Sequence, residues 1–303
     1  MEDQPVPTRR ECGTLAAHYL LVERDPTIRD RLRELEEATA QRMALGTADV
    51  PARKITIEMV VHIIYNRDSE NINDAQIESQ IDVLNRDFRG KNPNTKNVPK
   101  PWKGLVADAK FEFALASKDP EGNPTNGITR TRTDRKSFSV NDDIKFTARG
   151  GRDTWGTDYL NCWVGTLSGG LLGYAQFPGG PPETDGIVIL NTGFGTTGTA
   201  APPFNGGQTT THEVGHCFNL RHIWADDPGC GIDDGCTDTP VQATPNFGCP
   251  TFPHVSCNNG PNGDMSMNFM DYTDDACMSM FTPQQVARML ATLEGPLSTL
   301  GQS

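Results

Sequence analysis

The sequence predicts an α/β (α+β) fold, because stretches of strand character alternate with stretches of helical character. Residues 55–65 form an apolar run rich in β-branched side chains, which is typical of a buried strand. Residues 73–90 carry apolar side chains on one helical face, between a capping arrangement at Asn73 and a stop at Gly90. After residue 222 the chain is rich in Gly, Pro, Asp and Cys, which predicts a loop-rich part.

Residues 1–53 are predicted to be an addition ahead of the main domain. Within them, residues 27–43 have apolar side chains at helical spacing among many charges. Residues 45–54 are typical of an exposed linker, and Arg53 and Lys54 offer a cut site for a trypsin-like protease. Further strands are expected at 111–115, 161–166 and 186–190, and a last helix from Thr282 with Val286, Met289, Leu290 and Leu293 on its inner face.

The chain is acidic, with 27 Lys and Arg against 39 Asp and Glu, a net charge of −12. This charge disfavours nucleic acid and anionic membrane surfaces as partners. No apolar run is long enough to span a membrane. The first residues, from Met1 to Pro5, lack the basic start and apolar stretch of a signal peptide.

Residues 211–222, Thr-His-Glu-Val-Gly-His-Cys-Phe-Asn-Leu-Arg-His, carry the main chemical signal. His212 and His216 are four residues apart, so they share a helix face and can bind one ion. His222 lies too far along an unbroken helix, and Asn219 stands where the chain must turn, because Asn is the usual second choice after Gly for a left-handed helix end. Three neutral imidazoles leave one tetrahedral position of Zn²⁺ open, which is the catalytic pattern.

Chance is a poor explanation for this string. A chance His-Glu-x-x-His is expected on the order of once in a hundred such sequences, and the third His lowers that by roughly fifty. The alternative is a helix whose core histidines happen to have this spacing. Glu213 follows the first His and can reach a metal-bound water without ligating the metal.

A second motif, Asn268-Phe269-Met270-Asp271-Tyr272, is followed by Cys277 and by Phe281-Thr282. Together with the zinc string it resembles the pappalysin-like (ulilysin, cytophagalysin) branch of the metzincin proteases. In metzincins a Met lies in a tight turn beneath the zinc ligands, although Met270 alone also fits an ordinary core Met. The chain departs from the commonest metzincin string in having Asn219 in place of Gly.

The resemblance implies the metzincin zincin fold, a mixed twisted sheet with an active-site helix over a smaller irregular C-terminal subdomain. The expected parts are a pro-segment at 1–53 and catalytic subdomains at 54–222 and 223–303, with a cleft between the two subdomains for an extended peptide. The candidate edge strand for substrate is Gly170, Leu171, Leu172, Gly173 and Tyr174. A Gly-rich hairpin without a substrate role fits the same residues.

The implied activity is that of a zinc endopeptidase. Zn²⁺ on the three histidines would lower the pKa of its water, and Glu213 would pass the proton of that water to the leaving amine. Tyr272 resembles a family Tyr whose hydroxyl stabilises the tetrahedral intermediate. Two other classes stay open: a catalytically silent zinc-containing secreted protein that binds or inhibits, and a hydrolase of non-peptide amides.

The string Arg10-Glu11-Cys12-Gly13-Thr14 resembles the Cys-containing pro-segment of the same enzymes. A thiolate is a good fourth zinc ligand and would displace the catalytic water, so Cys12 is expected to keep a zymogen latent. The alternative is a free or disulfide-bonded Cys in a disordered tail.

Acidic side chains after His222 suit calcium, and the tentative ligands are Asp226, Asp233, Asp234 and Asp238. An exposed acidic loop fits them equally well. The resemblance implies disulfides Cys230–Cys257 and Cys249–Cys277. It gives no partner for Cys162, Cys217 and Cys236, and the sequence does not show whether they pair. The clustered cysteines and the resemblance imply a secreted protein, and a monomer is expected.

Substrate specificity is open at this stage. Some relatives cut before Lys or Arg with an acidic residue at the base of the pocket, immediately before the Cys that matches Cys277. That position is Ala276 here, which argues against a basic preference, although Asp274 and Asp275 could supply the charge.

Overall fold

The computed structural model describes residues 6–44, 54–295, 297 and 299–300, so residues 45–53 of the predicted linker, with Arg53, lie outside the described residues. The helices are α1 (Thr14–Arg24), α2 (Ile28–Ala44), α3 (Asp74–Asp87), α4 (Gln208–Cys217) and α5 (Pro283–Leu293). The strands are β1 (Ile55–Tyr65), β2 (Phe111–Leu115), β3 (Ile128–Arg132), β4 (Leu160–Gly165), β5 (Gly173–Ala175), β6 (Ile187–Leu190), β7 (Phe247–Gly248) and β8 (Tyr272–Thr273).

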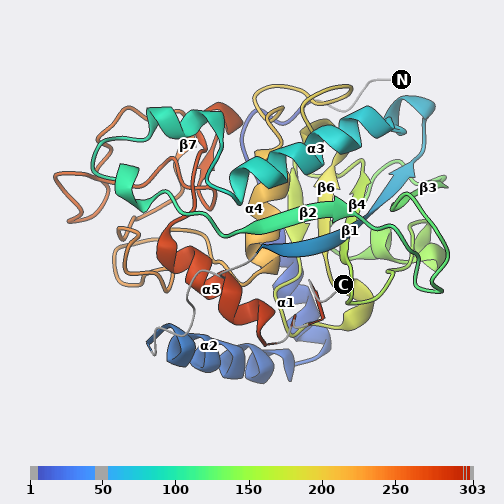
Figure 1. Cartoon of the computed structure of the whole chain (residues 1–303), viewed down its shortest axis with the longest axis horizontal. Coiled ribbons are helices and arrows are strands. Elements are labelled where there is room, and N and C mark those ends of the chain that lie inside the picture. Colours follow the sequence, from blue (N-terminus) through green and yellow to red (C-terminus); the bar gives the residue numbers. More distant parts are fainter. Residues whose placement is uncertain (1–5, 45–53, 296, 298, 301–303) are drawn as a thin grey trace.

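Six strands form one mixed sheet, in the order β2-β1-β4-β6-β5 with β3 also paired to β1 (Figure 1). All pairs are parallel except that of β5 with β6, which places an antiparallel strand at the edge. β2 and β3 share one side of the long strand β1, because β2 pairs with its first half and β3 with its second. The predicted strands are confirmed, and β3 is an additional one.

The two faces of the sheet bury different clusters, as the period of two in a strand requires. Ile57, Met59, Val61 and Ile63 of β1 face α3, α4 and α5, whereas Ile64 turns to the opposite face with Trp163. β1 therefore reads as a continuous apolar run because both faces are covered. The apolar faces of α3 and α4 pack against the same side of the sheet, which fixes the position of α4.

The ends of the helices follow the expected chemistry. The side chain of Asn73 accepts a hydrogen bond from the Gln76 amide at the start of α3. Thr282 and Gln285 form a reciprocal capping box at the start of α5, and Pro283 occupies the first turn. Both predicted helix starts are confirmed.

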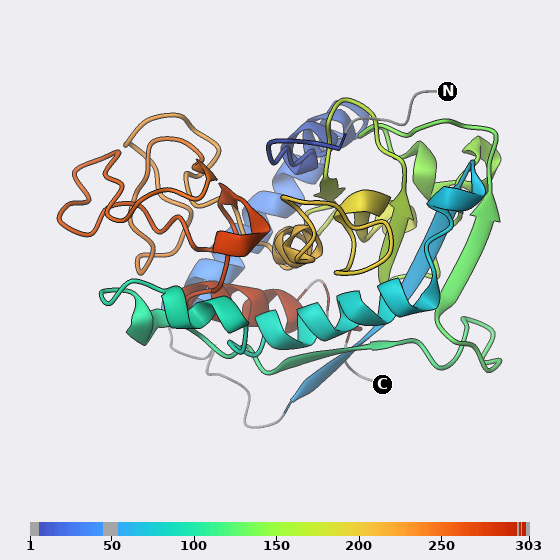
Figure 2. The same ribbon diagram turned by 90° about the horizontal axis from the view of Figure 1, so that it is seen from above.

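Residues 223–282 form an irregular lobe beside the sheet, with only the two-residue strands β7 and β8 as regular pairing (Figure 2). Disulfides Cys230–Cys257 and Cys249–Cys277 close this lobe, which confirms the pairing that the resemblance implied. The lobe is not a separate body, because Phe269, Met278 and Phe281 belong to the same buried cluster as β1.

The N-terminal segment crosses the molecule and contributes two helices. The predicted helix at 27–43 is confirmed as α2, which lies beside α5 (Figure 1). Helix α1, which packs on β5, was not predicted; its buried side chains Ala17, Leu21 and Val22 give only a short apolar stripe. No helix within the described ranges is long and apolar enough to cross a membrane.

Candidate active site

Helix α4 presents two of the three predicted metal ligands. It begins after Gly207, and every residue from Gln208 to Cys217 is buried. The helix ends at Phe218, and Asn219 adopts a left-handed conformation with φ of 69°. The predicted turn at Asn219 is confirmed, and it brings His222 back toward His212 and His216.

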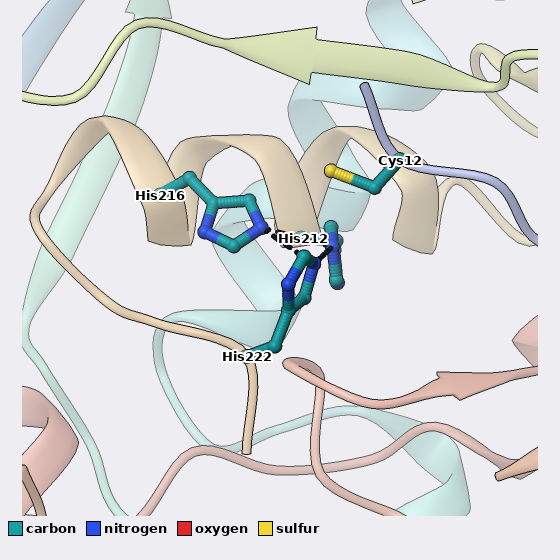
Figure 3. A group of neighbouring side chains, drawn as sticks. All are labelled: Cys12, His212, His216 and His222. Carbon is teal, nitrogen blue, oxygen red and sulfur yellow. Dashed lines mark hydrogen bonds between the residues drawn. The ribbon is translucent and has the colours of Figure 1, made fainter. Parts of the chain in front are cut away.

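The three imidazoles converge through their Nε2 atoms (Figure 3). The Nε2 atom of His212 is 3.2 Å from that of His216 and 3.2 Å from that of His222, and the remaining separation is 3.0 Å. A tetrahedral zinc with Zn–N bonds of its usual length would set these atoms about 3.4 Å apart. The spacing therefore suits one zinc ion.

The other ring nitrogens determine the tautomers. The Nδ1 atoms of His212 and His216 lie 2.7 Å and 2.8 Å from the carbonyl oxygens of Phe269 and Leu220, and Nδ1 of His222 contacts the Asp226 carboxylate. These partners only accept hydrogen bonds, so each Nδ1 donates and each Nε2 keeps a lone pair. Three buried lone pairs that meet in one place repel one another unless a cation binds there.

Burial acts in the same direction on protonation. It lowers the pKa of His212 well below its ordinary value, with the neighbouring histidines adding to the effect, and it lowers the pKa of His216 to about 3. Both rings are therefore neutral at neutral pH, as metal ligands must be.

Met270 lies against α4 at Gly215, between the first two histidines of the cluster. A Cβ atom built on Gly215 would come within 2.6 Å of the Met270 sulfur, so only Gly fits between His212 and His216 at this close approach. The next residue but one, Tyr272, packs its ring 4.9 Å from that of His222. Burial raises the pKa of Tyr272, and the nearby charges of Cys12 and Glu213 raise it further.

Glu213 is buried beside the ligands and under β5. A Cβ atom on Gly173 would be 3.0 Å from the Glu213 Cγ, so the edge strand passes directly over this carboxylate. Thr14 Oγ1 donates to Glu213 Oε2 at 2.9 Å. Burial raises the pKa of Glu213 to about 7, against the effect of the hydrogen bonds from Thr14 and Cys12.

Cys12 is brought to the same point. Its sulfur and the three imidazoles have ligand atoms within 4.8 Å of one another, and this is the only group of three or more His, Cys, Asp or Glu side chains placed to share a metal ion within the described part of the chain. The backbone around Cys12 pairs with the edge strand: Leu172 N donates to Glu11 O at 3.0 Å and Gly13 N to Gly173 O at 2.8 Å. This pairing is parallel to β5.

The predicted edge strand is placed correctly, but its extent is shorter than expected. Tyr174 and Gly173 lie in β5, and Leu172 also pairs, because its carbonyl accepts from Leu190 N at 2.8 Å. Gly170 and Leu171 precede the strand, since Gly169 and Gly170 both have positive φ and turn the chain into it.

One contact beside the site was missed by the sequence interpretation. Arg10 is buried, and its Nη2 lies 2.6 Å from the Asp275 carboxylate. Asp275 also accepts from the Gly206 amide at 2.8 Å. The resemblance placed the acidic pocket residue of some relatives at the position of Ala276. In this chain the acidic residue, Asp275, lies one position earlier. The sequence signal that could have indicated this contact was the position of Arg10, two residues before Cys12 in the N-terminal string.

The four aspartates proposed for calcium do not converge. Asp226 binds His222, while Asp234 accepts from Thr239 Oγ1 at 2.7 Å. Asp238 accepts from Thr282 Oγ1 at 2.7 Å at the start of α5, and Asp233 accepts from the Gly235 amide at 2.9 Å. Among the remaining cysteines, Cys162, Cys217 and Cys236 are buried thiols without a disulfide partner in the described residues.

Comparison with known proteins agrees with this geometry. The family model Peptidase_M43, described as pregnancy-associated plasma protein-A, matches residues 151–294. An extracellular metalloprotease of Arthroderma benhamiae is 33% identical over 268 residues, which cover 84% of this chain and 78% of that relative.

Two solved structures from Tannerella forsythia are also similar. A promirolysin mutant is 45% identical with a TM-score of 0.86, and the match covers 95% of each chain. Mature mirolysin in complex with a cleaved peptide is 47% identical with a TM-score of 0.78, and the match covers 84% of this chain and all of that one. With its convergent histidines and this similarity, the chain belongs to the M43 family of pappalysin-like metzincins and is a zinc endopeptidase.

Proposed function

We propose that His212, His216 and His222 hold the catalytic zinc and that Glu213 is the general base. The convergence of the three Nε2 lone pairs, with the Glu213 carboxylate beside them, carries this assignment. Zn²⁺ bound there would act as a Lewis acid that activates a water molecule and polarises the scissile carbonyl.

The residues around the zinc have separate tasks. Glu213 takes a proton from the attacking water and delivers it to the leaving amine, a task that its raised pKa of about 7 suits. The Tyr272 hydroxyl donates to the oxyanion of the tetrahedral intermediate. The edge of β5 from Leu172 to Tyr174, which the N-terminal segment covers in this structure, pairs with the backbone of an extended peptide once that segment is removed.

The N-terminal segment, residues 1–53, is proposed to keep the enzyme latent. Cys12 would occupy the fourth zinc position, and Thr14 engages Glu213 directly. The similarity to promirolysin supports a zymogen. Mature mirolysin matches a share of this chain close to that of residues 54–303, which supports removal of the segment at the predicted linker. The catalytic part is proposed to consist of two subdomains, residues 54–222 and 223–303.

Arg10 suggests the specificity. Its guanidinium fills a buried site closed by Asp275, Thr209 Oγ1 and the Thr273 carbonyl, next to the metal site. We propose that this site takes a Lys or Arg side chain after the scissile bond. A peptide-library digest should show that selection, and Asp275→Asn should abolish it; an unselective wild-type digest would contradict the proposal.

Calcium and secretion remain proposals of the same kind. Of the four aspartates, Asp233 faces solvent, and a rise in thermal stability with added calcium would support a site in this lobe. The relatives named extracellular metalloproteases support secretion. The intact Glu213 gives no reason to prefer a catalytically silent binding protein.

The deciding experiment measures hydrolysis of denatured casein by the full chain and by residues 54–303, with and without a zinc chelator. A latent zinc endopeptidase predicts cleavage by the shorter chain that chelator stops and zinc restores, and suppressed cleavage by the full chain. Cys12→Ala should activate the full chain. Cleavage that persists in chelator would reject the zinc assignment.

A further inference from the structure

The carboxylate of Glu36, in the N-terminal segment, lies in a polar site of the catalytic part. This site is formed by Arg221, Arg288 and Asn219 and is called the cradle below. Glu36 on α2 accepts a hydrogen bond from Arg288 Nη2, and its second oxygen is 3.5 Å from Arg221 Nη2. The Arg288 side chain is only 4% exposed, while that of Glu36 is 26% exposed. Arg221 is 41% exposed, so the cradle is partly open to solvent, but the pair of Glu36 with Arg288 is far more buried than the pair of Arg33 with Asp30 on α2.

The cradle contacts the turn that leads from α4 to His222. Arg288 Nε donates to the Asn219 carbonyl at 2.6 Å, and Arg221 directly precedes the ligand His222. The buried Asn219 Nδ2 has no well-formed hydrogen bond among the described residues, although this side chain lowers the pKa of Glu36. Two guanidinium groups and one amide therefore surround a single carboxylate position.

The charge balance shows that the cradle favours an anion. Burial raises the pKa of Glu36, but the hydrogen bond and charge of Arg288 and the charge of Arg221 outweigh it, so the pKa lies below its ordinary value. Asp226 lines the same cavity and contacts His222, and its charge also interacts with Arg221. The charge of Arg288 interacts in the same way with Asp234, so the cradle is not left without acidic neighbours. When α2 leaves, Arg288 and Arg221 lose the carboxylate that they share.

The position of the cradle along the cleft follows from the pairing with β5. The N-terminal segment runs from Arg10 in the Asp275 site, past Cys12 at the metal, toward Phe177. At that far end lies a cavity of about 510 Å³, lined among others by His18, Glu36, Phe177, Asn219 and Arg221. The Asp275 site and the cradle therefore lie on opposite sides of the metal ligands.

This arrangement fixes which part of a substrate would reach the cradle. If the Asp275 site takes the residue after the scissile bond, the residues before that bond extend toward Phe177 and Arg221. Such a substrate runs opposite to the N-terminal segment, and so antiparallel to β5. The parallel direction of the N-terminal segment would therefore make it a poor substrate for the site that it covers.

We propose that Arg221, Arg288 and Asn219 form an anion site in the processed enzyme that selects an Asp or Glu side chain of the substrate upstream of the scissile bond. Glu36 holds this place in the zymogen. The inference rests on the proposed function, because it takes the orientation of the substrate from the Asp275 site.

The test uses the full chain after its N-terminal segment has been removed by limited trypsin treatment. The substrates are peptides with Arg after the scissile bond and either Glu or Gln at one of the second to fifth positions before it. We expect kcat/KM to be about fivefold higher for Glu than for Gln at one position, the size of a partly exposed ion pair. The ratio should decrease with added salt.

Arg221→Gln and Arg288→Gln should each reduce the Glu-to-Gln ratio to near one. Arg132→Gln, a charge change on β3 where the side chain is 64% exposed, is the matched control and should keep the ratio. Equal rates for Glu and Gln at every position would overturn the anion site, as would a ratio that survives both cradle variants. Casein hydrolysis in the same samples separates these results from a failure of the proposed function, which would abolish all chelator-sensitive cleavage.

Discussion

The two sides of the active site are held by different forces. On the sheet side, α4 rests on β5, β6 and α3 through a continuous apolar cluster that includes Val214 and Cys217. On the other side, residues 223–282 also bury apolar side chains, such as Met265 and Phe269, but two disulfides and several buried carboxylates are added to this packing. Asp271 accepts hydrogen bonds there from Asn246, Tyr272 and Gln242, and Asp264 accepts from Asn246, His254, Ser256 and Asn259.

This difference shows two ways to position a catalytic side chain. Packing on a sheet is insensitive to pH and redox state, because it depends on apolar area. A lobe whose apolar packing is supplemented by buried carboxylates and disulfides depends in part on both. Both sides are needed, since His212 on α4 donates to the Phe269 carbonyl of the irregular lobe.

The largest effect is expected from Glu213→Ala on the sheet side. Loss of the proposed general base should reduce kcat on the order of 10⁴-fold, while zinc stoichiometry and the melting temperature of the processed enzyme stay close to wild type. Casein or peptide turnover measures kcat, metal analysis measures the zinc stoichiometry, and thermal unfolding measures the melting temperature. If the variant lost zinc as well as turnover, Glu213 would be holding the site together rather than moving a proton.

The next largest effect is expected from removing the disulfide Cys230–Cys257 of the irregular lobe. Replacing both cysteines with Ser should lower the free energy of unfolding by on the order of 3 kcal/mol, the value for a loop of this length. Hydrogen exchange should accelerate in residues 226–264 while β1 and β4 stay protected. Ile63→Ala, in the shared core, is the contrasting variant and should cost roughly 2–5 kcal/mol throughout the chain. Equal acceleration in β1 for the Ser variant would show that the two sides are one cooperative unit.

The buried carboxylate Asp271 predicts a pH dependence. Burial raises its pKa to about 6 despite the hydrogen bonds from Asn246 and Tyr272. Since the folded pKa lies above the unfolded value, this group stabilises the fold most below about pH 4, and that contribution is lost as the pH rises to about 6. Relative to Asp271→Asn, wild type should lose about 3 kcal/mol over this range.

Denaturant unfolding of both proteins in a Glu213→Ala background, which prevents autolysis, measures this difference. The same substitution at Asp68, whose side chain is 86% exposed, is the matched control. A difference between wild type and Asp271→Asn that is flat from pH 4 to pH 6 would contradict the role of burial at Asp271.

Tyr272→Phe should have the smallest effect. Removing the proposed donor to the oxyanion should lower kcat by about a hundredfold, with little change in KM, because we propose that the hydroxyl acts in the transition state. The ring still packs against His222 and Trp224, so stability should not change. A KM effect without a kcat effect would assign Tyr272 to substrate binding.

The sequence interpretation succeeded where one local rule dominates and was wrong where partners lie far apart. β1 and the turn at Asn219 follow from the apolar run and from the position of a left-handed residue. The strand predicted over residues 170–174 is shorter because two glycines turn the chain first. The contact between Arg10 and Asp275 could not be predicted, since 265 positions separate them and both are residue types that usually lie on the surface.

The spacing of His212, Glu213, His216 and His222 was enough to predict the metal ligands, the general base and the chemical class, because helix geometry and zinc coordination fix that spacing. Tertiary structure alone decided what surrounds them. It placed Arg10 in the Asp275 site and Glu36 between Arg221 and Arg288, and it joined the irregular lobe to the core of the sheet. Long-range contacts of this kind leave no periodic trace in the chain, because each is made by single side chains that only the completed fold brings together.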